Sequence, residues 1–200
     1  VYLDGKLVSA EEALKKAGLK PLTLSYKEGL ALMNGTAAMT GIGAFTLFGA
    51  EKLLNIACVN AAFAIEIFGG IDDAFDMDLH HVKPHPGQLS ISKTIGNLYR
   101  ETGNITIREN MHDQIRNQND KDKDIPVFET NINVQDVYSI RCTPQILAPV
   151  REAIEYAVKT VETEANSSND NPIIIPDKKK IIHGGNFHGQ SISFAMDILC

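Results

Sequence analysis

The spacing of hydrophobic and polar positions predicts a chain that is mainly helical. Residues 27–70 are apolar on nearly every face and rich in glycine and alanine, which is typical of a helix buried in a bundle. The dipeptide Asn34-Gly35 predicts a break near the start of this stretch. Helical spacing recurs over residues 88–101, from Thr143 to about Asn166, and from Ser191 onward.

Turn signals predict two small β-hairpins. Asp4-Gly5 has the residues of a tight hairpin turn within residues 1–8. Residues 173–182 predict the second hairpin, in which Pro176-Asp177 forms the turn between two apolar segments.

Helix-start signals lie next to these elements. Ser9 and Glu12 form a capping-box pattern for a short helix that Gly18 ends. Thr143 and Pro144 have the residue types of an N-cap and a first helical position, and we expect a long helix from there.

Two polar segments lack a clear period. Residues 71–87 are rich in Asp, His and Pro and predict irregular structure. Residues 103–130 predict an exposed, mobile stretch that is at most partly helical. Because no internal repeat or linker divides the chain, we expect residues 1–200 to form one mainly α domain fragment with no internal boundary.

The composition is that of an ordinary globular protein. Of 200 residues, 44% are hydrophobic and 22% are charged, which excludes intrinsic disorder and collagen-like structure. The formal net charge of −6, from 19 basic and 25 acidic residues, argues against binding to nucleic acid or to anionic membranes. Cys58, Cys142 and Cys200 are far apart in sequence and predict reduced thiols in a cytoplasmic protein.

Two further features concern location and length. The most apolar stretch, residues 53–68, contains polar and charged side chains and is expected to be too short to span a bilayer. The chain starts at Val1 and stops at Cys200 within a helical pattern, so we expect it to be a piece of a longer protein.

Candidate chemistry is concentrated in residues 134–142 (VQDVYSIRC). Gln135, Tyr138 and Arg141 are three positions apart, so on a helix they would face one cavity. Arginine can bind a carboxylate with two parallel hydrogen bonds, and tyrosine can donate or move a proton. The set suits an anionic substrate, although spacing by itself favours a surface arginine and a half-buried tyrosine on an amphipathic helix.

Three other segments are weaker candidates. Residues 166–172 (NSSNDNP) fit an elaborate helix-ending turn. The glycine-rich residues 184–189 (GGNFHG) could receive an anion on backbone N–H groups but lack a phosphate-loop pattern. No metal is expected, because diagnostic ligand spacing is missing from the set Asp78, His80, His81 and His85.

Five segments occur together in the order seen in the aromatic amino acid lyases, a family that contains histidine, phenylalanine and tyrosine ammonia-lyases and related aminomutases. The resemblance extends from Val1 to Cys200. It implies the long-helix bundle of the ammonia-lyases, here its central portion, and a homotetramer whose active sites combine residues from several subunits. The segments are residues 27–36 (KEGLALMNGT), 84–88 (PHPGQ), 134–142, 166–172 and 184–189.

The resemblance also implies a reaction, the elimination of ammonia from an aromatic α-amino acid to give an α,β-unsaturated acid. The electrophile of the family is MIO (4-methylidene-imidazole-5-one), formed autocatalytically from an Ala-Ser-Gly tripeptide. No such tripeptide occurs in these 200 residues, so the chain alone is expected to be inactive.

Five residues match the functional positions of the family motifs. Asn34 resembles the asparagine beside the prosthetic group and the substrate carboxylate, and Gln135 resembles the amide that lines the same pocket. Tyr138 resembles a catalytic tyrosine contributed across a subunit boundary, and Arg141 resembles the carboxylate clamp. Phe187 resembles the aromatic residue packed by the prosthetic group.

The identity of the substrate is less well defined. His188 after Asn186-Phe187 is more similar to bacterial histidine and tyrosine lyases than to plant phenylalanine enzymes, and we favour L-histidine and its conversion to urocanate. A tyrosine or phenylalanine lyase, an aminomutase and a non-catalytic helical oligomerisation scaffold are the alternatives.

Overall fold

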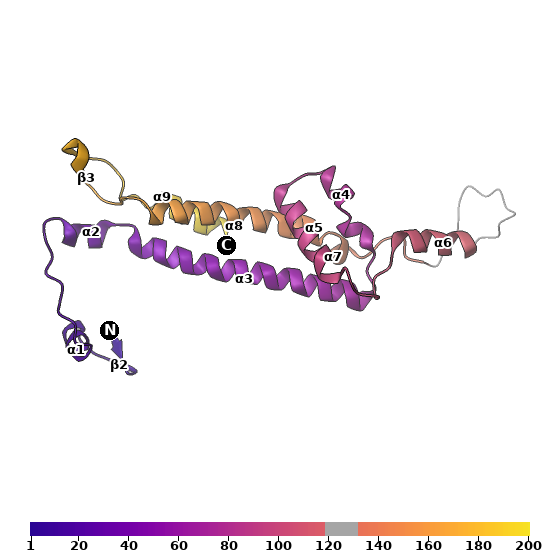
Figure 1. Ribbon diagram of the computed structural model, residues 1–200, viewed down its shortest axis with the longest axis horizontal. Coiled ribbons are helices and arrows are strands. Elements are labelled where there is room, and N and C mark those ends of the chain that lie inside the picture. Colours follow the sequence, from indigo (N-terminus) through magenta and orange to yellow (C-terminus); the bar gives the residue numbers. More distant parts are fainter. Residues whose placement is uncertain (119–131) are drawn as a thin grey trace. The chain divides into compact units, whose positions relative to one another are not determined.

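The computed structural model describes residues 1–118 and 132–200, and helices dominate it (Figure 1). The mainly α prediction with two small hairpins is therefore confirmed. The elements, in chain order, are β1 (Tyr2–Leu3), β2 (Lys6–Leu7), α1 (Ala10–Lys16), α2 (Glu28–Asn34), α3 (Ala37–Phe68), η1 (Asp72–Phe75), α4 (Met77–His81), α5 (Pro86–Tyr99), α6 (Arg108–Gln118), α7 (Tyr138–Arg141), α8 (Thr143–Ala165), β3 (Ile173–Ile175), η2 (Pro176–Lys178), β4 (Lys180–Ile182) and α9 (Gln190–Ile198), where η marks a 3₁₀ turn.

Internal contacts divide the chain into two compact units, each made of two separate segments. Unit 1 comprises Val1–Ala37 and Ser168–His188, and unit 2 comprises Ala38–Ser167 and Gly189–Cys200. The expectation of one fragment without an internal boundary stays a prediction.

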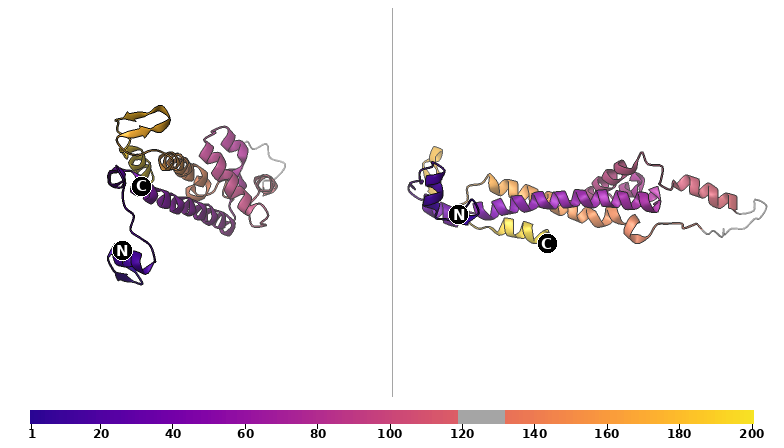
Figure 2. Two further views of the ribbon diagram at one scale, coloured as in Figure 1. Left: turned by 60° about the vertical axis from the view of Figure 1, so that its left-hand side comes forward. Right: turned by 90° about the horizontal axis from the view of Figure 1, so that it is seen from below.

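Unit 2 is organised around two long antiparallel helices. Figures 1 and 2 show α8 returning along α3 for much of its length, with α9 beside α8. Two clusters of buried side chains hold these helices together. One includes Leu54, Cys58, Ile65, Phe75, Ile91, Ile95, Ile140 and Ile154, and the other consists of Leu47, Ala157, Val161, Ile192 and Ala195.

Helix α5 packs very closely on α8 at Gly87. A Cβ atom at this position would lie only 2.4 Å from the carbonyl oxygen of Ala148, so glycine is required for the approach. The Gly87 N–H also donates to Glu152 Oε1 at 2.9 Å. This contact fixes the first turn of α5 against the middle of α8.

Residues 71–87 are more regular than their composition predicts. They contain η1, α4 and the start of α5, so the expectation of irregular structure is wrong for much of the segment. Tertiary packing stabilises these short turns, because His80 is fully buried and hydrogen bonds to the Ala74 carbonyl and to Gln88. Asp76 also caps α4 by accepting from the Asp78 N–H at 2.8 Å.

Within residues 103–130, helix α6 forms over Arg108–Gln118, in agreement with the expectation of partial helix. Residues 119–130 of that expectation lie outside the described residues. One face of α6 is anchored, since Met111 is only 2% exposed.

The predicted local signals are confirmed in unit 1. β1 pairs with β2 around Asp4 and Gly5, which both adopt positive φ as the turn requires. Ser9 accepts from the Glu12 N–H at 3.1 Å, and Gly18 follows α1 with φ +69°. β3 pairs with β4 in the second predicted hairpin.

The start of α8 differs from its prediction by one residue. The helix begins at Thr143, and Cys142 occupies the N-cap position. The Thr143 hydroxyl donates to the Ser139 carbonyl at 2.9 Å instead of capping the new helix. The side chain therefore continues the bonding of α7 and is not available as a cap.

Helix α3 is longer than the apolar stretch singled out from sequence. By length and composition alone its 32 residues could cross a membrane, so the argument that residues 53–68 are too short does not hold for the whole helix. The core helix of a soluble protein has the same property, and one face of α3 lies in the core described above. Several large apolar side chains on the rest of α3 are exposed, including Phe45, Phe48, Leu53, Phe63 and Ile67.

Candidate active site

Gln135, Tyr138 and Arg141 do not share one helix. Helix α7 contains only Tyr138–Arg141, and Gln135 precedes it at a bend in the chain, so the three residues do not lie on one helix as the spacing suggested. The helix starts late because Val137 has extended φ and ψ of −58° and 151°. The carboxylate of Asp136, one residue earlier, accepts a hydrogen bond from the Ile71 N–H.

The three side chains nevertheless line one cavity, as expected. This cavity has a volume of about 750 Å³, and its wall includes residues 133 and 135–141 with part of α3. Tyr138 is 67% exposed and is one of the residues that line the cavity.

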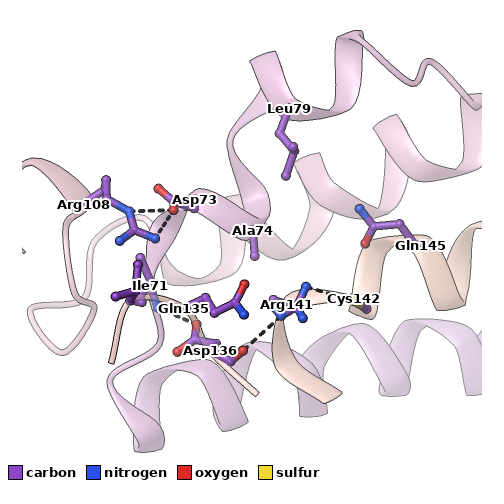
Figure 3. A pocket seen from close by; sticks show the side chains of 11 residues that line it. Ile71, Asp73, Ala74, Leu79, Arg108, Gln135, Asp136, Arg141, Cys142 and Gln145 are labelled. Carbon is purple, nitrogen blue, oxygen red and sulfur yellow. Dashed lines mark hydrogen bonds and ion pairs between the residues drawn. The ribbon is translucent and has the colours of Figure 1, made fainter. Parts of the chain in front are cut away.

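A second cavity of about 430 Å³ shares Gln135, Asp136 and Arg141 with the first (Figure 3). The Arg141 side chain therefore lines both. The other residues of the second cavity come from η1 and Ile71 directly before it, from α4, α6 and α8, and from the chain on either side of α7.

Arg141 is held by three local contacts. Its Nε donates to the carbonyl oxygen of Asp136 at 3.1 Å, and its Nη1 lies 4.0 Å from the Cys142 sulfur. The guanidinium carbon lies 5.2 Å from the centre of the Tyr138 ring, a cation–π contact. Among the described residues, these contacts leave Nη2 and most of the hydrogen-bonding capacity of Nη1 for an anion.

The second cavity contains a further charged pair, formed by Arg108 and Asp73. Both Nε and Nη2 of Arg108 donate to one Asp73 carboxylate oxygen (Figure 3). This hydrogen bonding raises the pKa of Arg108, against a smaller opposite effect of burial. Because Arg108 is already paired, Arg141 is the better candidate for an incoming carboxylate.

Hydrogen bonds to Thr106 hold the segment that leads from α3 into η1. Thr106 donates its N–H to the Gly70 carbonyl at 2.9 Å and its hydroxyl to the Gly69 carbonyl at 2.8 Å. The Asp72 N–H donates to the Thr106 carbonyl at 3.1 Å. These hydrogen bonds hold residues 69–73 rigidly, so they can support a side chain that binds to them.

The other two predicted site residues belong to unit 1. Asn34 is the last residue of α2 and has an exposed side chain. Phe187 is 44% exposed and lies in the loop before α9. Their roles beside a prosthetic group stay predictions.

Residues 166–172 do more than end α8, which the sequence did not indicate. Lys27 Nζ pairs with the Asp170 carboxylate and donates to the Pro172 carbonyl at 2.8 Å. The bond to Lys27 lowers the pKa of Asp170. Lys27 is the N-cap of α2 and has φ +69°, so these contacts hold the start of the helix that carries Asn34.

A second tie holds the end of α2. Asn169 Nδ2 donates to the Thr36 hydroxyl at 2.5 Å. A Cβ atom at Gly35 would lie 3.3 Å from the Asn169 carbonyl and 2.6 Å from that of Ala31. The break predicted at Asn34-Gly35 thus coincides with a close approach that only glycine permits.

Within residues 1–118 and 132–200, no cluster of three His, Cys, Asp or Glu side chains could hold a metal ion. Both ring nitrogens of His80 make hydrogen bonds within the protein. Its Nδ1 accepts from Gln88 Nε2 at 2.9 Å and its Nε2 donates to the Ala74 carbonyl at 3.0 Å, and burial lowers its pKa.

Known proteins resemble the chain over its whole length. A sequence model described as "Aromatic amino acid lyase" matches residues 1–200. "Histidine ammonia-lyase 2" of Fusobacterium nucleatum is 42% identical over 98% of this chain and 34% of its own length. The histidine ammonia-lyase of Treponema denticola is 40% identical over 99% of this chain and 35% of its own length.

Solved structures agree with these relatives. The phenylalanine aminomutase of Pantoea agglomerans superposes with a TM-score of 0.89 at 38% identity, over 99% of this chain and 38% of that one. The histidine ammonia-lyase of Trypanosoma cruzi gives 0.76 at 32% identity, over 98% and 32% of the two chains. The 200 residues span about a third of the length of the curated relatives they match.

Proposed function

This chain belongs to the aromatic amino acid lyase family, and we propose that in the complete gene product it supplies the carboxylate-binding wall of an ammonia-lyase active site. The observation that carries the proposal is the presence of Arg141, Tyr138 and Gln135 on one cavity. Arg141 is oriented by its neighbours and keeps donors for an anion.

The reaction breaks the Cα–N bond and a Cβ–H bond of an aromatic α-amino acid, and it releases ammonia and an α,β-unsaturated acid. Arg141 binds the substrate carboxylate through parallel N–H groups and fixes the position of the reacting carbons. Tyr138 holds or moves a proton at the reacting carbon or the leaving amine. Gln135 adds a polar contact in the same pocket.

The prosthetic group of the family, MIO, fits the residues only in part. Because these 200 residues contain no Ala-Ser-Gly, the group would have to come from chain outside them. When bound, it supplies an electrophile that takes up electron density from the substrate. Asn34 and Phe187 would face it, and their side chains have the exposure that such a contact needs.

L-histidine, with urocanate as the product, is our first choice of substrate. Two relatives at 40% identity or above carry the name histidine ammonia-lyase. An aminomutase acting on an aromatic amino acid is the second candidate, because the Pantoea phenylalanine aminomutase superposes with a TM-score of 0.89.

We also infer a cytoplasmic homotetramer. The support is the exposed apolar side of α3, since surfaces of this kind on soluble chains mark contacts with other protein. Light scattering on the complete gene product tests this, and a monomer would contradict it.

The activity test uses the complete gene product that contains residues 1–200. It is incubated separately with L-histidine, L-tyrosine and L-phenylalanine, and both ammonia and the unsaturated acid are measured. We expect equal amounts of the two products, formed fastest from L-histidine. A β-amino acid product would favour the aminomutase, and the absence of product from all three would overturn the proposal.

A further inference from the structure

We propose that Asp136 is a positioning residue for Arg141 and determines how this arginine receives the substrate carboxylate. The inference rests on the proposed function. Asp136 acts through two groups on the same residue: its carbonyl oxygen contacts the guanidinium, and its carboxylate fixes the residue to the rest of unit 2.

The first contact selects one side of the guanidinium. Arg141 Nε donates to the Asp136 carbonyl at 3.1 Å. An arginine offers a carboxylate two bidentate edges, one formed by Nε with one Nη and one formed by the two Nη groups. With Nε occupied, the carboxylate is received by the Nη1–Nη2 edge, which is the end of the side chain.

The second contact immobilises the carbonyl that makes this selection. Asp136 Oδ2 accepts from the Ile71 N–H at 2.7 Å. Ile71 is buried, and its segment is held by the Thr106 hydrogen bonds described above. The Asp136 carboxylate also packs against this turn, because a Cβ on Gly70 would lie 3.4 Å from Asp136 Oδ2, which is van der Waals contact.

Helix α7 cannot supply this rigidity by itself. It has only four residues, and its N-cap, Val137, offers no side-chain hydrogen bond. A single turn is intrinsically marginal, so its orientation depends on tertiary anchors. Asp136 provides such an anchor immediately before the turn that carries Tyr138 and Arg141.

The test separates ligands with a carboxylate from ligands without one, in the complete gene product. The probes are urocanate, which has the carboxylate, and histamine, the decarboxylated amine, each measured as an inhibitor of L-histidine turnover. Asp136→Ala should raise the inhibition constant of urocanate about tenfold or more, since the clamp is misplaced. The inhibition constant of histamine should stay within about twofold.

Two further variants show whether the effect is specific. Asp136→Asn keeps an oxygen acceptor for the Ile71 N–H and should restore urocanate binding to within about threefold of wild type. Glu152→Ala is the matched control, because Glu152 also accepts a backbone N–H from a residue 65 positions away, but at Gly87. It should leave the ratio of the two inhibition constants unchanged.

A double-mutant cycle tests whether Asp136 acts through Arg141. In an Arg141→Lys background, Asp136→Ala should weaken urocanate binding by no more than about twofold further, because the fork that it positions is already gone. Should Asp136→Ala fail to fold, Asp136→Glu replaces it. That variant moves the carboxylate by one methylene and should show the same selective loss for urocanate.

Equal losses for urocanate and histamine, no loss for either, or additive effects in the cycle would overturn the role of Asp136. Each of these outcomes requires a wild-type protein that turns over an aromatic amino acid. A wild-type protein without turnover would instead overturn the proposed function, and with it this role.

Discussion

Replacing Arg141 with lysine tests the carboxylate clamp at constant charge. Lysine loses the fork that makes two parallel hydrogen bonds, and one such bond contributes about 1.4 kcal/mol net. It also loses the stacking of the guanidinium on the Tyr138 ring, now 5.2 Å away, worth about 0.5 kcal/mol at an exposed site. Together these losses amount to about 2 kcal/mol, so kcat/KM should fall about 25-fold.

The assay follows initial rates of unsaturated acid formation by its ultraviolet absorbance in the complete gene product. Because the carboxylate is bound in both the ground state and the transition state, most of the loss should be in KM. A lysine has a single ammonium group, so it cannot contact the Asp136 carbonyl and the substrate carboxylate together with the geometry of Nε and the two Nη groups.

A matched control makes this prediction specific. Arg151→Lys is the same substitution in a solvent-accessible pair on α8, where Arg151 Nε donates to Glu155 at 2.8 Å. It should leave kcat/KM within about twofold of wild type. If Arg141→Lys also stays within about twofold, Arg141 does not bind the carboxylate and the reasoning is refuted.

Three other measurements test separate parts of the description. Tyr138→Phe deletes only the exposed hydroxyl, so kcat should fall about 100-fold with the fold intact; a change in KM alone would make Tyr138 a binding contact. Gly87→Ala should lower the free energy of unfolding by about 1–3 kcal/mol in urea titrations, because the new Cβ would meet the Ala148 carbonyl. Gly96→Ala on the same helix has room for a Cβ and should raise the free energy of unfolding by about 1 kcal/mol. A similar effect of both substitutions would contradict the close packing of α5 on α8. Burial lowers the pKa of His80, so the unfolded chain binds a proton that the folded chain does not, and stability should be full above about pH 6.5 and decline below it. His80→Gln should remove that decline and the exposed His81→Gln should not; an unchanged decline in His80→Gln would assign it to another group.

Local signals in the sequence predicted the elements whose cause is local. The Ser9–Glu12 capping box, the Asp4-Gly5 turn and the break at Asn34-Gly35 each depend on residues a few positions apart, and each is present in the structure. The long helices followed from their apolar patterns because they contain enough turns for a period to be visible.

Elements stabilised by distant contacts could not be predicted in this way. Helix α4 has five residues, and its regularity depends on burial of His80 against α5, which no local pattern encodes. Gln135 was placed on a helix because the three-residue spacing fitted one. The spacing could not show that Asp136 is bound to Ile71 and that the helix starts only at Tyr138.

The residue types of the candidate site could be predicted from the sequence, but the contacts that hold these residues in position could not. Arg141 was identified by its motif and its chemistry. The contact that orients it comes from a main-chain carbonyl, which every residue possesses and which therefore leaves no signal in the sequence. Lys27 has a side-chain partner, Asp170, but the two residues are 143 positions apart, so no local pattern could show that they pair.

That separation has a consequence for the time at which unit 1 can form. A ribosome adds about 5–20 residues per second, so about 7–30 s pass between synthesis of Lys27 and synthesis of Asp170. Throughout this interval α2 lacks the partners of its N-cap, and the nascent segment displays Leu22, Leu32 and Met33, which are exposed even in the folded chain. Residues 1–37 are thus synthesised before the other segment of unit 1 but completed only after residues 168–188 have been made, and we expect them to be most accessible to proteases and chaperones during translation.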